Sequence, residues 1–513
     1  MKTSAVGRSR PLGFLGRSQP RRFGTGVGAG FLAFAAAGVV LPAGLPLGVL
    51  FLGVVLGSLH GLAAMGLVLI YRSSRIINFA QVEIGGVAAA MAVLLVTGKD
   101  VPYLIAVPVG LVCALVVGAI VDVTVVKRLA TAPRLIATVA MVGVGQLLGA
   151  LQLVLPYLFS DDLESFTAFR TPFEFSRRVG PVLFRGDHLI AVVTACALFI
   201  AVSWFIGRTR TGTAIRGAAE APERARLAGI PIRRLSMIAW VVSAGLSGVA
   251  SLLSAPIVGV SVGSIAGPAA LVIPLTAAVL ARMESIGRAL TFAVALTCLQ
   301  QAIFWSYPSS AIVNLLLFGI VAIGLGTQRG GAVREGGDLA GSAAAAEPRR
   351  LPEDLRRHPT VRRVAAALVV IGAVVTLGVP AVMSEANVGL AANIVVYCMI
   401  VLSALVLTGW SGQVSLGQFA LVGVGAAATG ALIVETNGDL FLELLIASLL
   451  ASAVAVSIGA FTTRASGIFL GVVTLAAATA FSSYFFSATY FPVWTPASVP
   501  RPELFGRISI DSA

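Results

Sequence analysis

Apolar runs of about 20 residues recur along almost the whole chain, and this feature restricts the possible folds more than any other. In lipid only helices and closed barrels satisfy every backbone hydrogen bond, and each run has the length of one membrane-spanning helix. The composition agrees, because 58% of the 513 residues are hydrophobic and only 11% are charged. A soluble globular domain, a disordered chain and an enzyme held by one anchor are therefore excluded. The predicted fold class is all-α, a polytopic transmembrane helical bundle.

Fifteen runs satisfy the criteria for a span. Three of them (81–97, 266–281 and 310–326) are short, so we expect these to be tilted, broken or re-entrant. The fifteen runs cover residues 27–43, 48–70, 81–97, 102–126, 135–158, 188–207, 235–255, 266–281, 289–306, 310–326, 364–382, 391–409, 414–434, 440–462 and 467–487.

The positions of lysine and arginine predict how the spans are oriented. With the N-terminus in the cytoplasm, 29 of the 36 cations fall in cytoplasmic segments and seven fall outside. Cytoplasmic loops of membrane proteins carry such an excess. Topology therefore accounts for the net charge of +14, and no nucleic-acid partner is predicted. We expect a multi-pass protein of a bacterial plasma (inner) membrane, in contact with membrane lipid.

A polar segment at residues 327–363 separates two hydrophobic parts of the chain. It is rich in Gly, Ala, Pro and charged residues, which is typical of a flexible cytoplasmic linker. The predicted organisation is a basic cytoplasmic tail (1–26), a first half of ten spans (27–326), the linker, and a second half of five spans (364–513).

One segment recurs in both halves. Asn78-Phe-Ala-Gln81-Val-Glu83 aligns with Ser415-Leu-Gly-Gln418-Phe-Ala at an offset of 337 residues, and the same offset places Gly86 on Gly423. Both segments enter their spans from the cytoplasmic side, which indicates parallel repeats related by an axis along the membrane normal. The alternative is chance similarity between helices rich in Gly and Ala.

Polar side chains stand where these repeated spans begin, and two interpretations remain open. Polar groups at membrane depth are costly, and they usually face a bundle interior or a water-filled cavity. On that interpretation they line a translocation path. On the other, they lie near the interface and only cap helices. The candidate path residues are Asn78, Gln81, Glu83, Ser415 and Gln418.

No pattern for catalysis or metal binding is present. The three histidines are scattered, and the four cysteines lie within apolar runs without metal-ligand spacing. We therefore predict no catalytic residue and no metal site. Asp122 lies close before Lys127 in sequence, and the two are expected to form an ion pair at the interface.

The cytoplasmic segment at residues 208–234 is long and patterned. Ala214, Ala218, Ala225 and Ala228 recur at helical intervals, and Gly229-Ile230-Pro231 ends the pattern. A short amphipathic helix with a face of small residues suits docking into a groove on another protein. The alternative is a basic loop that lies on anionic lipid.

This segment resembles the coupling loop of bacterial ABC importer permeases, in which Ala-Ala is followed by Gly-Ile. Residues 66–83 look like the first permease subunit of the branched-chain amino-acid importers, whereas 406–426 and 464–476 look like the second. The resemblance implies that both subunits are fused in one chain. The residues that match the coupling loop are Arg216, Ala218, Ala219, Ala225, Gly229 and Ile230.

The resemblance implies a transport protein and not an enzyme. It would translocate branched-chain amino acids, or related small polar solutes such as urea, amides or other amino acids. No Gly-x-x-x-x-Gly-Lys-[Ser/Thr] stretch occurs in the chain, so we expect no directly bound cofactor and ATP–Mg on a separate ABC ATPase subunit. An extracellular or periplasmic solute-binding protein would deliver the solute.

Two other functions remain as alternatives. An ion-coupled secondary transporter also uses parallel repeats and acidic groups within the membrane, for which Glu83 and Asp122 are the candidates. A membrane scaffold or sensor is the other alternative, although no soluble signalling domain is evident in the sequence.

The sequence departs from the family pattern at several positions. Gln81 and Gln418 stand where the family usually has His, Arg72 replaces a usual Gly, and residues 280–286 replace a Gly-rich turn. These departures leave the substrate open. The second half reaches Ala513 without a coupling loop of its own. We therefore expect this half to be incomplete, as a fragment, a truncated reading frame or a half completed by another polypeptide.

Overall fold

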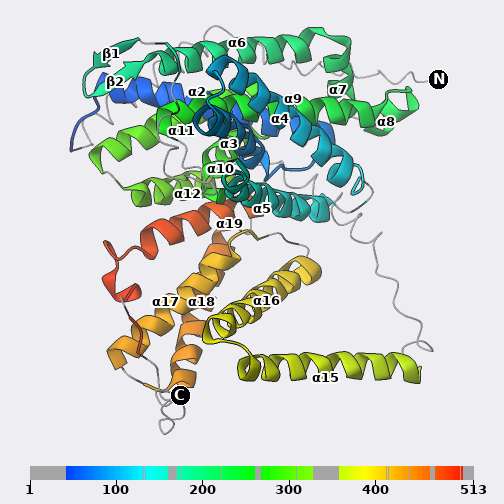
Figure 1. The fold of residues 1–513 in the computed structure, drawn as a ribbon, viewed down its shortest axis with the longest axis vertical. Helices are drawn as coiled ribbons and strands as arrows, with labels where there is room; N and C mark the ends of the chain where they lie inside the picture. The colour runs from blue at the N-terminus through cyan, green and yellow to red at the C-terminus, as the bar shows by residue number, and fades with distance from the viewer. Residues whose placement is uncertain are drawn as a thin grey trace, which may run out of the picture. The chain divides into compact units, whose positions relative to one another are not determined.

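The computed structural model is helical almost throughout its described part (Figure 1). The expected tail, most of the first expected span and linker residues 327–357 lie outside that part. The described residues are 42–130, 132, 134–159, 169, 171–173, 175–220, 222–259, 267–307, 309–326, 358–411, 413, 415–436, 438–462, 468–496 and 498–500.

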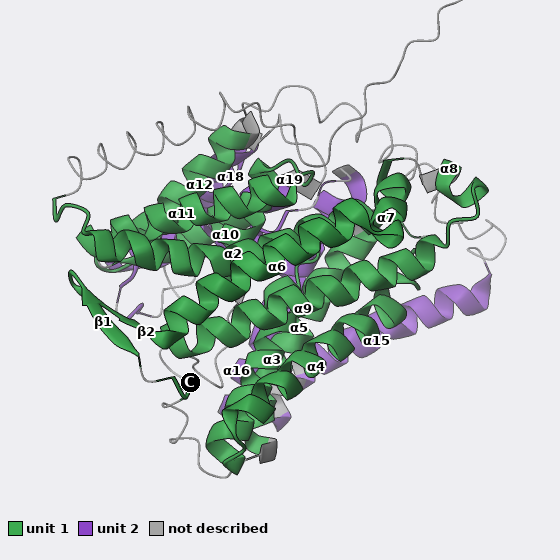
Figure 2. Ribbon diagram, turned by 90° about the horizontal axis from the view of Figure 1, so that it is seen from above, with its two compact units in different colours: residues 1–328, 475–492 green, residues 329–474, 493–513 purple. Residues whose placement is uncertain are grey.

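The chain separates into two compact units, which Figure 2 shows in different colours. Unit 1 contains residues 1–328 and 475–492, and unit 2 contains 329–474 and 493–513. The predicted domain limits remain a prediction.

Long helices make up most of unit 1. One antiparallel hairpin, β1 (Ser176–Val179) with β2 (Val182–Arg185), precedes α6, and Figures 1 and 2 place it at the opposite end of the unit from α7 and α8. The helices are α2 (Leu47–Ser74), α3 (Gln81–Lys99), α4 (Tyr103–Val121), the π-helix η1 (Asp122–Val126), α5 (Arg134–Phe159), α6 (Gly186–Arg208), α7 (Arg210–Glu220), α8 (Pro222–Leu227), α9 (Ile232–Val258), α10 (Gly267–Leu280), α11 (Ile286–Ser306) and α12 (Ser310–Gly326).

Unit 2 is a smaller set of helices. Its last long helix, α19, crosses the boundary: residues 468–474 belong to unit 2, whereas residues 475–480 and the π-helix η3 (Phe481–Phe485) that follows belong to unit 1. The short helix η4 (Pro492–Trp494) follows. The long helices are α15 (Pro359–Val382), α16 (Glu385–Ser411), α17 (Gln418–Thr436), α18 (Leu440–Thr462) and α19 (Ile468–Ala480).

Eleven helices in the described part are long and apolar enough to cross a membrane. Three shorter apolar helices, at Ala269–Leu280, Ser310–Gly324 and Leu470–Phe485, coincide with further expected spans. The predicted fold class, a polytopic helical bundle, is therefore confirmed. The count of fifteen spans stays a prediction.

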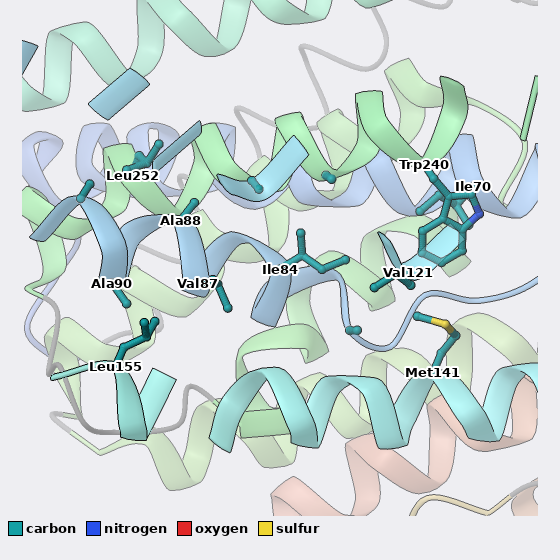
Figure 3. Packing of buried hydrophobic residues seen from close by; sticks show 14 of the residues in the cluster. Ile70, Ile84, Val87, Ala88, Ala90, Val121, Met141, Leu155, Trp240 and Leu252 are labelled. Atoms are coloured by element: carbon teal, nitrogen blue, oxygen red, sulfur yellow. The ribbon is translucent and has the colours of Figure 1, made fainter. Parts of the chain in front are cut away.

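The core of unit 1 forms around α2, because glycines leave one side of this helix without side chains and another helix can pack directly against its backbone. Gly53 and Gly57 let α11 approach closely, since a Cβ atom at either position would lie 2.7 Å from the Cα atom of Cys298 or of Val294. Such small-residue seams are typical of helix packing in membranes, where lipid is as apolar as the side chains. On another side of α2, Ile70, Ile84 and Trp240 belong to a buried cluster shared with α3, α4 and α5 (Figure 3).

Helix limits recur between the two units at the offset of the sequence repeat. Helix α2 ends at Ser74 and α16 at Ser411, 337 residues later. Helices α3 and α17 begin at the aligned glutamines and contain 19 residues each, and α4 and α18 begin at Tyr103 and Leu440. A succession of three helices with identical spacing supports the predicted repeat.

Candidate functional site

A break in the helices, residues 75–80, separates α2 from α3. Arg75 has a left-handed backbone with φ 56°, and its N–H donates to Tyr71 O at 2.8 Å, which ends α2. Residues 76–80 are buried. Non-helical backbone at membrane depth needs internal hydrogen-bond partners, and Asn78 Oδ1 supplies one by accepting the N–H of Ala80 at 3.0 Å.

The side chain of Gln81 is held inside the protein by three hydrogen bonds. Its Oε1 accepts from Asn78 Nδ2 at 2.9 Å and from Ser243 Oγ at 3.0 Å, and its Nε2 donates to Ser243 O at 3.1 Å. Ser247 Oγ also donates to the backbone oxygen of Gln81. Asn78, Gln81 and Ser243 are completely buried. In this conformation the amide of Gln81 therefore joins α3 to α9.

Glycines make this junction tight. A Cβ atom at Gly66 of α2 would lie 2.6 Å from Ser243 Oγ, and one at Gly85 of α3 would lie 2.7 Å from Ser247 Oγ. The backbones of α2 and α3 therefore lie in direct contact with the serine side chains of α9. Sequence reasoning missed these serines, although Ser243, Ser247 and Ser251 recur every fourth residue on α9.

Glu83 lies in the first turn of α3 and is also buried. Its Oε2 accepts from Gln152 Nε2 of α5 at 2.6 Å. Gln152 additionally donates to the backbone oxygen of Glu83 at 3.3 Å. The carboxyl group of Glu83 therefore connects α3 to α5, whereas the amide group of Gln81 connects α3 to α9.

In unit 2 the aligned residues Ser415 and Gln418 form the same turn, but Gln418 is less buried than Gln81. Ser415 Oγ accepts the N–H of Gly417 at 3.3 Å, just as Asn78 Oδ1 accepts the N–H of Ala80, two residues further along the chain in each case. Gln418 is only half-buried, and its Oε1 accepts from Ser403 Oγ of α16 at 3.4 Å. Asn78 and Ser415 thus act as turn caps, while a role in a path remains a prediction for all five residues.

Asp122 and Lys127 form the expected ion pair. The Lys127 Nζ atom lies 3.1 Å from Asp122 Oδ2, and Ser236 Oγ of α9 donates to Asp122 Oδ1 at 3.1 Å. Asp122 is completely buried and starts the π-helix η1. The pair therefore connects the end of α4 with the first turns of α9.

The coupling segment, residues 210–230, folds as two short helices, α7 and α8, where one was expected. Gly229 follows them with φ 74°, a left-handed conformation that favours glycine, and Pro231 precedes α9. The N–H of Ile230 donates to Ala225 O at 3.0 Å, which closes the end of α8.

Most of the alanine face of the coupling segment points into this chain, although Ala228 is exposed. Ala218, Ala219 and Ala225 are buried, and Ile215, Ala218, Ala225 and Leu235 form a small cluster of their own. Arg216 is half-buried, and its Nη2 donates to Thr213 Oγ1 at 3.2 Å. The exposed residues include Arg224, Arg226 and Leu227, the last with 88% of its surface accessible.

Arg72 contacts the turn that departs from the family pattern. Its Nη1 donates to Glu284 O at 2.7 Å, in the segment between α10 and α11. In this turn Arg282 and Met283 have φ values of 58° and 51°. The two departures from the family pattern, at Arg72 and at residues 280–286, therefore meet in the structure.

Comparison with known proteins identifies the family. The family described as "Branched-chain amino acid transport system / permease component" matches residues 49–326, more than half of the chain. The chain belongs to this family. It is therefore a membrane transport permease, as the helices in the described part also indicate.

Several curated permeases are similar over the same region. LivH of Escherichia coli K12, a high-affinity branched-chain amino acid transport permease, is 29% identical over 300 residues, which cover 53% of this chain and 91% of LivH. BraD of Pseudomonas aeruginosa is 29% identical over 249 residues (46% and 78%). A probable LivH of Methanocaldococcus jannaschii is 28% identical over 206 residues (38% and 62%). No solved structure matches.

The family match includes the coupling segment, the break that carries Asn78, and the start of α3 with Gln81 and Glu83. Ser415 and Gln418 lie beyond it. The relation of unit 2 to the second permease subunit therefore stays a prediction, supported by the common helix spacing.

Proposed function

We propose that this chain is the membrane-spanning component of an ABC importer for branched-chain amino acids or related small polar solutes. Separate ATPase subunits bind ATP–Mg and drive the transport. One observation carries the proposal: within the matching family region, the segment between the spans α6 and α9 is an ordered pair of helices with its own apolar cluster. A loop that only supplied positive charge would need no such cluster.

The ATPase contacts the outward-facing residues of the coupling segment. Because Ala218, Ala219 and Ala225 pack inward, the contact surface is provided by Arg224, Arg226 and Leu227. An exposed leucine that follows two arginines suits a pocket with an apolar floor and an acidic rim.

The mechanism is alternating access, a rigid-body change between two arrangements of the helices. The buried Asn78–Gln81–Ser243 cluster holds α3 against α9 in the arrangement described here. Opening separates these helices and exposes polar groups, including Gln81, to the solute.

The remaining topology and partners follow from this function. The N-terminus lies in the cytoplasm, in agreement with the positions of the hairpin and the coupling segment at opposite ends of unit 1. A solute-binding protein meets the outer face. Unit 2 acts as the second permease half, together with any polypeptide that completes it.

Reconstitution into liposomes tests the energy source. The purified chain is compared with and without an ATPase co-expressed from the same genomic neighbourhood, and uptake of radiolabelled leucine is measured with ATP or with a proton gradient. We expect concentrative uptake only with both the ATPase and ATP. Uptake driven by the gradient alone would establish the ion-coupled secondary transporter instead. Competition by unlabelled isoleucine, urea and acetamide defines the substrate class.

Cysteine cross-linking tests the contact surface. A cysteine replacing Leu227 on the coupling segment should cross-link to the ATPase. A cysteine replacing Leu147, which is 73% exposed on the spanning helix α5, is the matched control and should not. Equal cross-linking at both positions, or none at Leu227 in an active complex, would contradict docking at this segment.

A further inference from the structure

Two arginines at the end of α2 reach separate cytoplasmic elements. Arg72 Nη1 donates to Glu284 O at 2.7 Å in the α10–α11 turn, and Arg75 Nη2 donates to Ala219 O at 2.9 Å near the end of α7. These contacts join residues 212 and 144 positions apart in sequence. In the sequence both arginines count among the cytoplasmic cations, and Arg72 also departs from the family pattern.

Arg75 donates its hydrogen bond to a backbone carbonyl group, Ala219 O, that lies near the end of a helix. The last four carbonyl groups of an α-helix have no partner within the helix, and a cation near them is favoured by the helix dipole. Ala219 is the residue before the end of α7, and it is buried although the Arg75 side chain is exposed. The guanidinium therefore completes the C-terminal end of α7 from outside that helix.

Arg75 is itself fixed in place. Its N–H donates to Tyr71 O at 2.8 Å, and its guanidinium carbon lies 5.7 Å from the centre of the Tyr71 ring. It is also the first residue of the α2–α3 break, three residues before Asn78. One residue thus ends α2, begins the break and holds the end of α7.

The residues on the α7 side of the contact pack together. Ile215 and Ala218 of α7 share a buried cluster with Ala225 of α8 and Leu235 of α9. A force applied to the exposed residues of α8 is therefore transmitted to α7, because packed side chains do not deform continuously. At Arg75 the force reaches the break.

We propose that Arg75 is a positioning residue, which holds the end of α7 against the α2–α3 break so that displacement of α7 moves Asn78 and Gln81. The contact itself stands on the structure. Its consequence for transport rests on the proposed function, because it requires an ATPase that displaces α7.

Hydrogen–deuterium exchange of the full chain in lipid nanodiscs tests the contact without any partner. The variants are Arg75→Ala, Arg75→Lys and the matched control Arg72→Ala, which removes a similar bond from the same helix end. We expect exchange in residues 76–80 and in the last turn of α7 to rise about fivefold in Arg75→Ala, the size of one lost hydrogen bond. Arg75→Lys should recover part of it. Arg72→Ala should raise exchange in residues 281–285 instead.

The amount of leucine taken up per ATP hydrolysed, measured in the assembled complex, tests the role of Arg75 in transport. In Arg75→Ala, leucine uptake per ATP hydrolysed should fall about fivefold, while ATPase binding and ATP hydrolysis stay within about twofold of the wild type. A purely structural defect would lower uptake and hydrolysis in equal proportion, and that result would overturn the proposal. Unchanged exchange in residues 76–80 would overturn it as well. A wild-type chain that transports without an ATPase would refute the proposed function, and the exchange experiment would still decide the contact.

Discussion

The aligned glutamines of the two units provide a matched pair for testing what Gln81 does. Replacing Gln81 with Ala removes three hydrogen bonds from a completely buried side chain. Hydrogen bonds between membrane helices contribute about 0.6 kcal/mol each on average, so Gln81→Ala should lower the free energy of unfolding by about 2 kcal/mol.

Gln418→Ala should lower the free energy of unfolding much less, because it removes one long hydrogen bond. The side chain is half-buried, and its bond to Ser403 has a length of 3.4 Å, at the outer limit for a hydrogen bond. The expected loss is below about 0.5 kcal/mol. The difference between the two variants corresponds to about a tenfold ratio in their unfolding equilibria.

The assay is reversible unfolding in mixed micelles, followed by far-ultraviolet circular dichroism while the fraction of sodium dodecyl sulfate increases. Transport measurements on the same variants separate the two roles of Gln81. If it only holds helices together, uptake of every solute falls by the same factor. If it also contacts solute, the preference between leucine and urea changes. Equal destabilisation by the two substitutions would refute the reasoning from burial and bond length.

Two further predictions concern the packing of unit 1. In Gly57→Ala the new Cβ would lie 2.7 Å from Val294 Cα, so overpacking should cost about 1–3 kcal/mol and lower the melting temperature in detergent. Gly143→Ala, on a helix position with nothing within 4 Å, should instead gain up to about 1 kcal/mol from helix propensity, and a loss as large as that of Gly57→Ala would contradict the close approach of α2 and α11. Lys127→Met leaves the carboxylate of Asp122 completely buried without its cation and should destabilise the protein by about 3 kcal/mol in the same unfolding assay. Adding Asp122→Asn should recover most of this loss, and no recovery would show that the cost does not come from an uncompensated charge.

Local features of the fold could be predicted because their causes lie within a few residues. The start of α3 at Gln81, the helical coupling segment and the Asp122–Lys127 pair all follow from short-range patterns. The turn at Gly229 follows from the glycine and the nearby proline. The hairpin at residues 176–185 was missed, although Gly180 in its turn has φ 60°. Each of its strands has only four residues, too few for a clear period of two.

The contacts that build the site could not be predicted because their partners are distant in sequence. Ser243 is 162 positions from Gln81, and Gln152 is 69 positions from Glu83. Periodicity shows which face of a helix is apolar or small, but not which other helix covers it. For the same reason the alanine face of α7 indicated docking, without showing that residues of this chain cover part of it.

The difference between Gln81 and Gln418 shows that the repeated sequence alone does not make the site. Both glutamines follow the same kind of turn, but only Gln81 is covered by α9, which supplies Ser243 and Ser247. Helix α9 begins at Ile232, directly after the coupling segment, so about 11 helical residues, or about 16 Å, separate that segment from Ser243. The coupling segment therefore reaches Gln81 by two routes, along α9 and through Arg75. A rigid helix fixed at one point can pivot, whereas in the proposed mechanism a second attachment converts a push on α8 into relative motion of α3 and α9. On this proposal, the relative motion of α3 and α9 separates the Gln81–Ser243 contact.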